Sequence, residues 1–259
     1  MSETTMRAPI APAPISLPRT YATLLRWTFA SVGPMLPLIV VVQAMLAAGM
    51  IVGFGFLIPD IGQATAMFLS TGAPTVLLLI LGLVIVPQGV AQARANGTFT
   101  YMRSLPVARP LVLVADLTVW LVVALPSVAV AVVVAWWRYD VAFSFDWPLL
   151  IAGAILVAVM ATAVGYAIAV TFPPMLAQML TQVLVFFVML FSPINFPADQ
   201  LPGWFQSLHA GLPFEAGANI LRAGLVADVF DAGARDLLVL GAWTLLGLAV
   251  SLRALLRRR

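Results

Sequence analysis

Six long apolar stretches that contain almost no charged residue limit what this chain can fold into. A helix that crosses the hydrocarbon core of a bilayer needs about 20 mostly apolar residues. We expect spans at residues 32–58, 71–92, 111–137, 148–171, 175–194 and 234–252. Hydrophobic residues make up 63% of the chain and charged residues only 9%, which is far from the composition of soluble domains. The sequence therefore predicts an all-α membrane protein with six transmembrane helices.

Arginine residues are distributed unevenly between the two sides of these spans. Basic residues close to a span are retained on the cytoplasmic side of the membrane. If both termini are cytoplasmic, only Arg138, Arg222 and Arg235 of the 13 basic residues lie outside. Of the ten acidic residues, only Glu3 and Asp116 then lie on or near the inside. This asymmetry predicts an even number of spans and two cytoplasmic termini.

The segment before the first span divides into a tail and a candidate interfacial helix. Residues 1–18 are rich in proline, alanine and serine and cannot bury enough apolar surface to become ordered, so we expect a flexible cytoplasmic tail. Residues 19–259 then form a single transmembrane domain. From residue 17 to residue 29, aromatic and leucine side chains alternate with two arginines. This mixture is typical of a helix in the membrane interface, and it is also compatible with an extension of the first span.

Prolines and glycines mark particular points of the spans. Pro74 and Pro148 lie near predicted helix starts, where a missing amide proton has little cost. Pro126 lies in the middle of the third span and should kink it unless neighbouring groups compensate. Both a hinge and a packing accommodation fit this position. In the first span, the spacing of Gly49 and Gly53 allows another helix to approach closely.

The cytoplasmic loop between the second and third spans contains a candidate helix of its own. Asn96 is suited to cap a helix, and Phe99, Met102 and Leu105 follow at spacings of three residues. Three arginines surround this apolar stripe. The pattern predicts a short amphipathic helix that ends at Pro106. Its stripe fits either the lipid headgroups, which the periodicity alone favours, or a groove on a cytoplasmic partner.

The external segment of residues 195–236 is too apolar to be solvated and too rich in proline and glycine to span the membrane. Irregular backbone at membrane depth must be covered by protein or face a water-filled cavity. We therefore expect short helices that enter the outer leaflet and return. Glu215 and Arg222 lie seven residues apart and fit one face of such a helix. An outer cap over the helix ends and a part of an exit path are both open interpretations.

Several kinds of catalysis are disfavoured by the residue types that the chain lacks. A single histidine, His209, cannot form a two-histidine zinc motif, and no cysteine is available for thiol chemistry. The chain has no lysine, so it has no Walker A loop, and it has no G-x-S-x-G motif. Asp116 is the one carboxylate expected inside a span, near the start of the third helix, and we favour a structural role for it.

Two groups of residues carry a resemblance to a known family. They are the cytoplasmic Asn96-Gly97-Thr98 and Ser104-Leu105-Pro106-Val107-Ala108-Arg109, and the outer Ser192-Pro193-Ile194-Asn195-Phe196-Pro197, Leu201-Pro202, Trp204, Leu212-Pro213 and Arg222. With these motifs in this order, nearly the whole chain resembles the membrane subunit, or permease, of type 2 ABC exporters. Members commonly carry a glutamate-rich stretch just before Gly-Thr, where this chain has Ala93-Arg94-Ala95-Asn96.

The resemblance implies how the protein would assemble. Two permease subunits, identical or paralogous, pair in a bacterial cytoplasmic membrane and contact its lipids. Two separate ABC-type ATP-binding subunits dock below them and hold ATP and magnesium, so this chain needs no cofactor and no catalytic or metal-binding residue of its own. No nucleic acid is expected as a partner.

The resemblance also implies roles for particular residues. The residues expected to couple the permease to the ATPase are Asn96, Thr98, Phe99, Met102 and Leu105. Those expected along the substrate path on the fifth span are Gln178, Gln182, Phe186, Phe187 and Met189. Those expected at the outer gate are Phe196, Trp204, Glu215 and Arg222. Under this resemblance, contact with the ATPase replaces the lipid headgroups as the favoured role of the cytoplasmic helix.

The expected function is therefore that of a transmembrane permease subunit in an ATP-driven exporter. A path of phenylalanine, methionine, leucine and a few glutamines suits an amphiphilic drug-like or lipid-like substrate better than a highly charged solute. Two other classes remain open from the residues alone. One is a secondary carrier or channel without an ATPase, and the other is a membrane anchor or assembly subunit.

Overall fold

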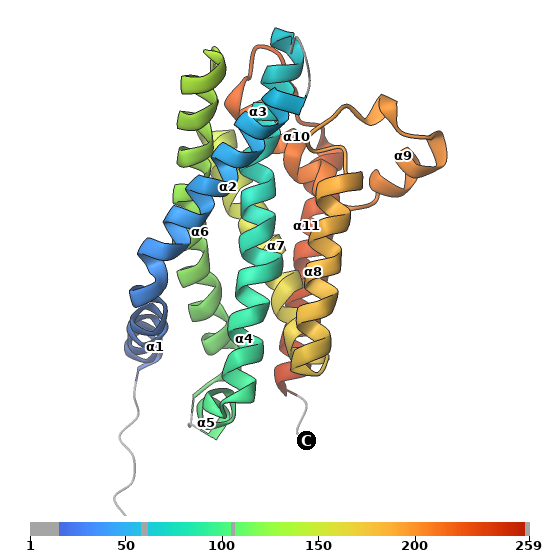
Figure 1. The fold of residues 1–259 in the computed structure, drawn as a ribbon. Helices are drawn as coiled ribbons and strands as arrows, with labels where there is room; N and C mark the ends of the chain where they lie inside the picture. The colour runs from blue at the N-terminus through green and yellow to red at the C-terminus, as the bar shows by residue number, and fades with distance from the viewer. Residues whose placement is uncertain (1–15, 58–61, 105–106, 257–259) are drawn as a thin grey trace, which may run out of the picture.

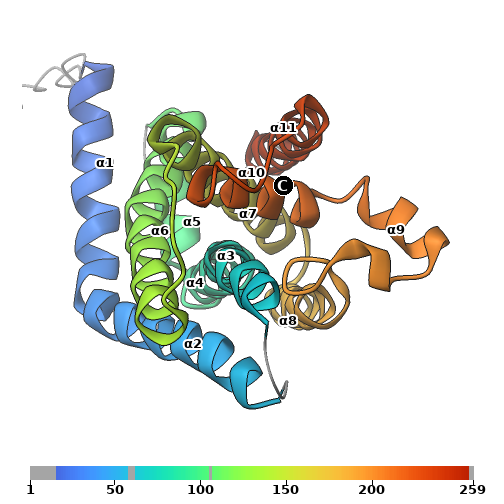
Figure 2. The ribbon, with the colours of Figure 1, turned by 90° about the horizontal axis from the view of Figure 1, so that it is seen from above.

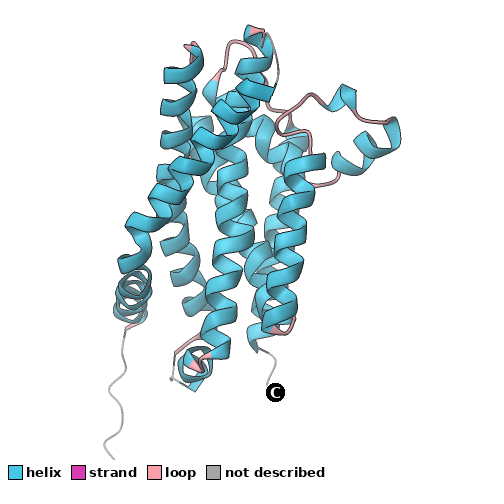
Figure 3. Cartoon of the chain, viewed as in Figure 1, coloured by secondary structure: helices cyan, strands magenta, loops and turns pink. Residues whose placement is uncertain are grey.

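The computed structural model describes residues 16–57, 62–104 and 107–256. Helices joined by short connections make up almost all of this part of the chain, and it contains no β-strand (Figure 3). Six helical segments in it are long and apolar enough to cross a membrane. They are Leu17–Gly53, Gln63–Ala95, Arg109–Tyr139, Trp147–Thr171, Pro174–Phe191 and Ala234–Leu256. The prediction of an all-α protein with six transmembrane helices is confirmed.

The first apolar segment consists of two helices that run in different directions. Helix α1 (Leu17–Val32) is joined to α2 (Leu36–Leu57) by the short 3₁₀ turn η1 (Gly33–Met35). Seen from above, α1 runs along one edge of the bundle beside α6 and turns sharply into α2 (Figure 2). The corner falls at this 3₁₀ turn, where Pro34 has no amide proton to donate to the preceding turn of helix. Helix α1 is therefore not a straight extension of the first span.

The second span is one continuous segment built from α3 (Gln63–Ile80), η2 (Leu81–Ile85) and α4 (Val86–Ala95). It starts earlier than predicted, because residues such as Ala66 and Leu69 are buried against neighbouring helices. Pro74 consequently lies inside α3, and the prediction that it marks a helix start was wrong.

The segment η2 is a π-helical turn in which the amide of Val86 donates to the carbonyl of Leu81. Pro87 follows directly and has no amide proton for the carbonyl four residues earlier. A turn with five-residue spacing accommodates this missing donor, as wide turns inside α-helices often do.

The third and fourth spans are α6 (Arg109–Tyr139) and α7 (Trp147–Thr171). Helix α6 continues through Pro126 without a break in the helix. Pro148 lies at the second position of α7, as predicted, and the carboxylate of Asp146 accepts from the amide of Leu149 at the start of that helix.

The α3–η2–α4 segment and α7 form the centre of the bundle. In the most apolar stretch of the α3–η2–α4 segment, 89% of the residues are buried, and in that of α7, 61% are buried. Their closest approach is at Gly82 and Gly165, where a Cβ on Gly165 would meet the carbonyl oxygen of Gly82. Helix α11 (Ala234–Leu256) packs on the same central helix through Gly247, where an added Cβ would lie 2.9 Å from the backbone nitrogen of Val164. In contrast, Gly49 and Gly53 face open space within this chain.

The chain between the fifth span α8 (Pro174–Phe191) and α11 folds into the short helices η3 (Ala198–Gln200), α9 (Gly203–His209) and α10 (Pro213–Leu225). Helix α9 projects sideways from the bundle, whereas α10 is buried between α3, α7 and α11 (Figures 1 and 2). The prediction of short helices here agrees with the structure. Helix α10 is part of the bundle and not a cap laid over its surface.

Candidate functional site

The predicted cytoplasmic helix is present as α5 (Thr98–Ser104) and lies across the end of the bundle that also carries α1 (Figure 1). The side chain of Asn96 accepts a hydrogen bond from the amide of Thr98 at 3.1 Å, so it caps the start of the helix as predicted. Between them, Gly97 has a φ of +82°, which glycine adopts without the strain that a Cβ would add. Leu105 lies outside the described residues.

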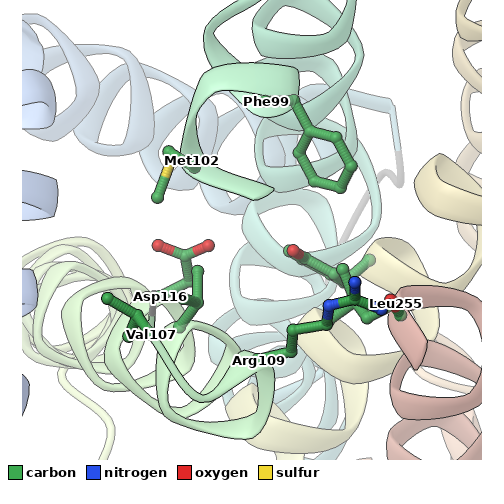
Figure 4. Close-up of a pocket in the computed structure, with 8 residues that line it drawn as sticks. Phe99, Met102, Val107, Arg109, Asp116 and Leu255 are labelled. Carbon is green, nitrogen blue, oxygen red and sulfur yellow. Dashed lines mark hydrogen bonds between the residues drawn. The ribbon is translucent and has the colours of Figure 1, made fainter. Parts of the chain in front are cut away.

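The apolar stripe of α5 faces the body of the protein. Phe99 and Met102 line a small cavity of about 30 Å³, which is enough for one water molecule (Figure 4). The other residues that line it are Val107, Arg109, Val112, Asp116, Tyr166 and Leu255. Asn96 and Gly97 before the helix, and Thr100 and Tyr101 within it, are exposed. Of the predicted coupling residues, Asn96 is therefore exposed, Thr98 is half-buried, and Phe99 and Met102 line the cavity.

The cavity beneath α5 is lined by residues of α6, α7 and α11. Asp116 of α6 accepts a hydrogen bond of 3.0 Å from the hydroxyl of Thr28 in α1. Arg109, at the start of α6, donates to the carbonyl oxygen of Leu255 at 2.7 Å, near the C-terminal end of α11. The structural role predicted for Asp116 agrees with this geometry, but no local sequence pattern indicates Thr28 as its partner.

A second arginine joins the same loop to another helix end. Arg94, the penultimate residue of α4, donates to the carbonyl oxygens of Ala169 and Phe172 at the C-terminal end of α7. The loop that carries α5 is thus attached to α7 on one side and to α11 on the other. Unpaired carbonyls at helix ends accept from arginine readily, because the helix dipole is negative there.

The residues predicted for the substrate path divide between two faces of α8. Gln178, Gln182 and Phe186 follow one another at four-residue spacing and are exposed. Phe187 is half-buried, and its ring lies 5.4 Å from that of Phe191 in the same helix and 6.0 Å from that of His209 in α9. Met189 is half-buried and packs against the hydrophobic core. Only the first three therefore present a surface to a partner or a substrate.

The outer-gate residues do not form one cluster. Trp204 on α9 is 72% exposed and Phe196 is half-buried, whereas Arg222 on α10 is only 2% exposed. Glu215 is half-buried near the start of α10, and burial raises the pKa of its carboxyl while the nearby positive charges oppose that rise.

Arg222 is held by contacts that the sequence did not reveal. Its guanidinium donates to the backbone carbonyl of Ile194 and, at 3.3 Å, to the side chain of Asn219. It also lies 3.6 Å from the centre of the Phe68 ring in α3, a cation–π contact. Burial lowers the pKa of Arg222 to about 9, so the guanidinium is still charged at neutral pH. Arg222 therefore joins α10, α3 and the loop after α8.

Unsatisfied polar atoms surround this arginine. The Nε of Arg222, both side-chain amide atoms of Asn195 and the hydroxyl of Ser192 are buried and have no hydrogen-bond partner within the described chain. The side chains of Ser192 and Asn195 in the motif Ser192 to Pro197 are thus buried, and the backbone carbonyl of Ile194 between them accepts from the arginine. The arginine and this motif therefore form a buried contact that connects structural elements.

A comparison with protein-family models decides what kind of protein carries these features. Residues 22–226, which run from α1 through α10 to the first residue after it, match the model of the ABC-2 type transporter. The chain belongs to the ABC-2 type transporter family. No curated protein matches the chain. The ABC-2 assignment makes the chain the multi-pass permease subunit of an ABC transporter, a subunit that associates with separate ATP-binding subunits.

Proposed function

We propose that this ABC-2 permease exports an amphiphilic drug-like or lipid-like molecule across a bacterial cytoplasmic membrane. It would work as a dimer with two ATP-binding subunits and with both termini in the cytoplasm. The observation that supports this proposal best is the outward face of α8, the fifth span. That helix is mostly exposed on the surface of the single chain, as are the first and sixth spans, and polar residues on its exposed face set it apart.

Two amides distinguish the exposed face of α8 from an ordinary lipid-facing surface. Gln178 and Gln182 lie one helical turn apart among Met175, Met179 and Phe186. An amide that faces hydrocarbon has no hydrogen-bond partner, which is unfavourable. A second permease subunit or a water-containing path along this face would satisfy both side chains. Methionine and phenylalanine next to them offer adaptable apolar contacts, which suits an amphiphilic substrate.

Pairing along α8 can be tested by disulfide cross-linking, because the chain has no native cysteine. We expect the Gln182→Cys variant to form a covalent permease dimer in membranes treated with a mild oxidant, as measured by non-reducing electrophoresis. The matched control is Leu238→Cys on α11, which is 73% exposed and lies on another helix. Dimers from Leu238→Cys but not from Gln182→Cys, Phe186→Cys or Met179→Cys would contradict the proposed pairing.

The geometry of α5 supports a specific mode of ATPase coupling. The exposed side of the helix, with Thr100 and Tyr101, would contact the ATP-binding subunit. Phe99 and Met102 would transmit the movement, because both side chains line the cavity that α6, α7 and α11 also line. In this scheme, the residues of the apolar stripe transmit the coupling and make no direct contact with the partner.

A double truncation of this stripe tests the coupling. Phe99→Ala combined with Met102→Ala should lower ATP-dependent transport into inverted vesicles by about tenfold, which is within the usual range of coupling free energies. The ATP-binding subunits should still co-purify with the variant, because the exposed face of α5 is unchanged. Phe172→Ala is the matched control at the same end of the bundle, since the contact of Phe172 with Arg94 uses its backbone carbonyl.

Three outcomes of this experiment separate the function classes. Loss of transport with retained co-purification supports a coupled exporter. Transport that needs no ATP-binding subunit would indicate a secondary carrier or channel. Absence of transport by the unaltered complex, with a stable association, would indicate an anchor or assembly subunit.

A further inference from the structure

We infer that the groove between α1 and α6 is a binding site for one anionic phospholipid of the membrane. The groove has a volume of about 430 Å³, which lies within the size range of small-molecule sites in proteins. Its walls come from Leu25, Arg26, Phe29 and Ala30 of α1 and from Thr118, Val119 and Val122 of α6. All of these side chains except Arg26 and Thr118 are apolar.

The groove is built by hydrogen bonds that hold α1 in place. The hydroxyl groups of Tyr21 and Thr118 lie 2.8 Å apart, and Thr28, about two helical turns further along α1, donates to Asp116 of α6. These two contacts fix a helix that runs along one edge of the bundle against a helix that spans it (Figures 1 and 2). Such a junction is where lipid headgroups meet acyl chains.

Charge identifies the occupant as an anionic lipid. Arg26 is exposed and is the one charged residue in the groove wall. Its guanidinium can bind a phosphate through two hydrogen bonds. Arg19 lies seven residues earlier, on the same face of α1, and adds a second positive charge. Asp116, the acidic group nearest in sequence to the α6 wall, accepts from Thr28 and lines the cavity beneath α5.

The apolar walls fit the acyl chains of the same lipid. Val119 and Val122 face the groove one turn apart, so a chain attached to a phosphate at Arg26 can run along α6 into the membrane. Phe29 covers the other side. The combination of one cationic end and an apolar body is the shape of a phospholipid and not that of a soluble anion.

This lipid site is separate from the proposed substrate path. Seen from above, α1 and α6 lie on one side of the bundle and α8 on the other (Figure 2). The bound lipid would brace α1, which contacts the cavity beneath α5 through Thr28 and Asp116. The inference therefore goes beyond the proposed transport function and does not depend on the identity of the substrate.

Native mass spectrometry of the full complex, delipidated in detergent and titrated with phosphatidylglycerol or phosphatidylcholine, tests the site. We expect a preference for phosphatidylglycerol, and Arg26→Gln should weaken its binding by about fivefold, the effect of one arginine near an anionic surface. Val122→Trp should fill the groove and weaken the binding of both lipids. The matched control is Arg138→Gln at the opposite end of α6. This variant should change neither the binding of phosphatidylglycerol nor that of phosphatidylcholine.

Three results would overturn the inference. An unchanged preference for phosphatidylglycerol in Arg26→Gln would place the phosphate elsewhere. Unchanged lipid binding in Val122→Trp would show that the groove is not the site. Covalent permease dimers from Val122→Cys would show that a second copy of the chain covers it. Each result can be read while transport and ATPase association are intact, so a failure here is distinguishable from a failure of the proposed function.

Discussion

Arg222→Ala should lower the free energy of unfolding by about 3–5 kcal/mol, as expected when a large buried side chain and its hydrogen bonds are removed together. The carbonyl of Ile194 and the side chain of Asn219 would each lose a charged donor, and the ring of Phe68 would face a cavity. For a protein of this size, the melting temperature in detergent should fall by about 6–20 °C, as measured by a thermal-shift or aggregation assay.

Two further variants separate the physical contributions at this site. Arg222→Met keeps much of the side-chain volume but removes every donor, so its loss of stability should be smaller and due mainly to unpaired carbonyl and amide groups. Arg235→Ala is the matched surface control, because Arg235 is exposed and donates one hydrogen bond to the carbonyl of Ala210. It should change stability by no more than about 0.5 kcal/mol. Equal melting temperatures for Arg222→Ala and Arg235→Ala would refute the role of Arg222 as a connection between structural elements.

Gly165→Ala should destabilise the protein by about 3 kcal/mol, at the upper end of the usual range for overpacking. The added methyl group would overlap the carbonyl oxygen of Gly82 and approach the ring of Pro87 to 2.9 Å. Neither neighbour can rotate away, because one is backbone and the other is a proline ring. The expected readout is a melting temperature about 6–12 °C lower, together with reduced amounts of protein in the membrane.

Gly241→Ala is the control for this prediction. Gly241 also lies inside a spanning helix, α11, but an added Cβ there would meet nothing within 4 Å. Alanine is the better helix former, so this variant should be neutral or slightly more stable. A similar loss in both variants would mean that the effect comes from helix propensity and not from the contact between the two central helices.

Sequence reasoning was most successful where the bilayer or a local backbone rule decides the structure. The six spans follow from apolar length, and the start of α5 follows from the chemistry of Asn96 and Gly97. The start of the second span was placed too late, because residues 63–70 are less apolar than the rest of the span. They are buried by tertiary packing, which a hydropathy pattern does not measure.

Contacts between residues that lie far apart in the chain could not be predicted from the sequence. The sequence groups Glu215 and Arg222 with Trp204 as gate residues. In the structure, however, Trp204 is largely exposed and Arg222 is buried. The apolar spacing of Phe99 and Met102 was identified correctly, yet periodicity cannot say whether a stripe faces a partner or its own bundle. Those answers depend on which helices are neighbours, and a single sequence does not carry that information in any local pattern.

The attachments of Arg94 and Arg109 have a mechanical consequence for the whole molecule. The two arginines lie on either side of α5 and donate hydrogen bonds to the C-terminal ends of α7 and α11. A displacement of α5 would therefore act on both helices through these hydrogen bonds. At its other end, α7 lies in backbone-close contact with α10 at Leu150 and Gly224. Helix α7 is thus held by contacts near both of its ends. These contacts link the loop that carries α5 to α10 at the far side of the bundle through α7.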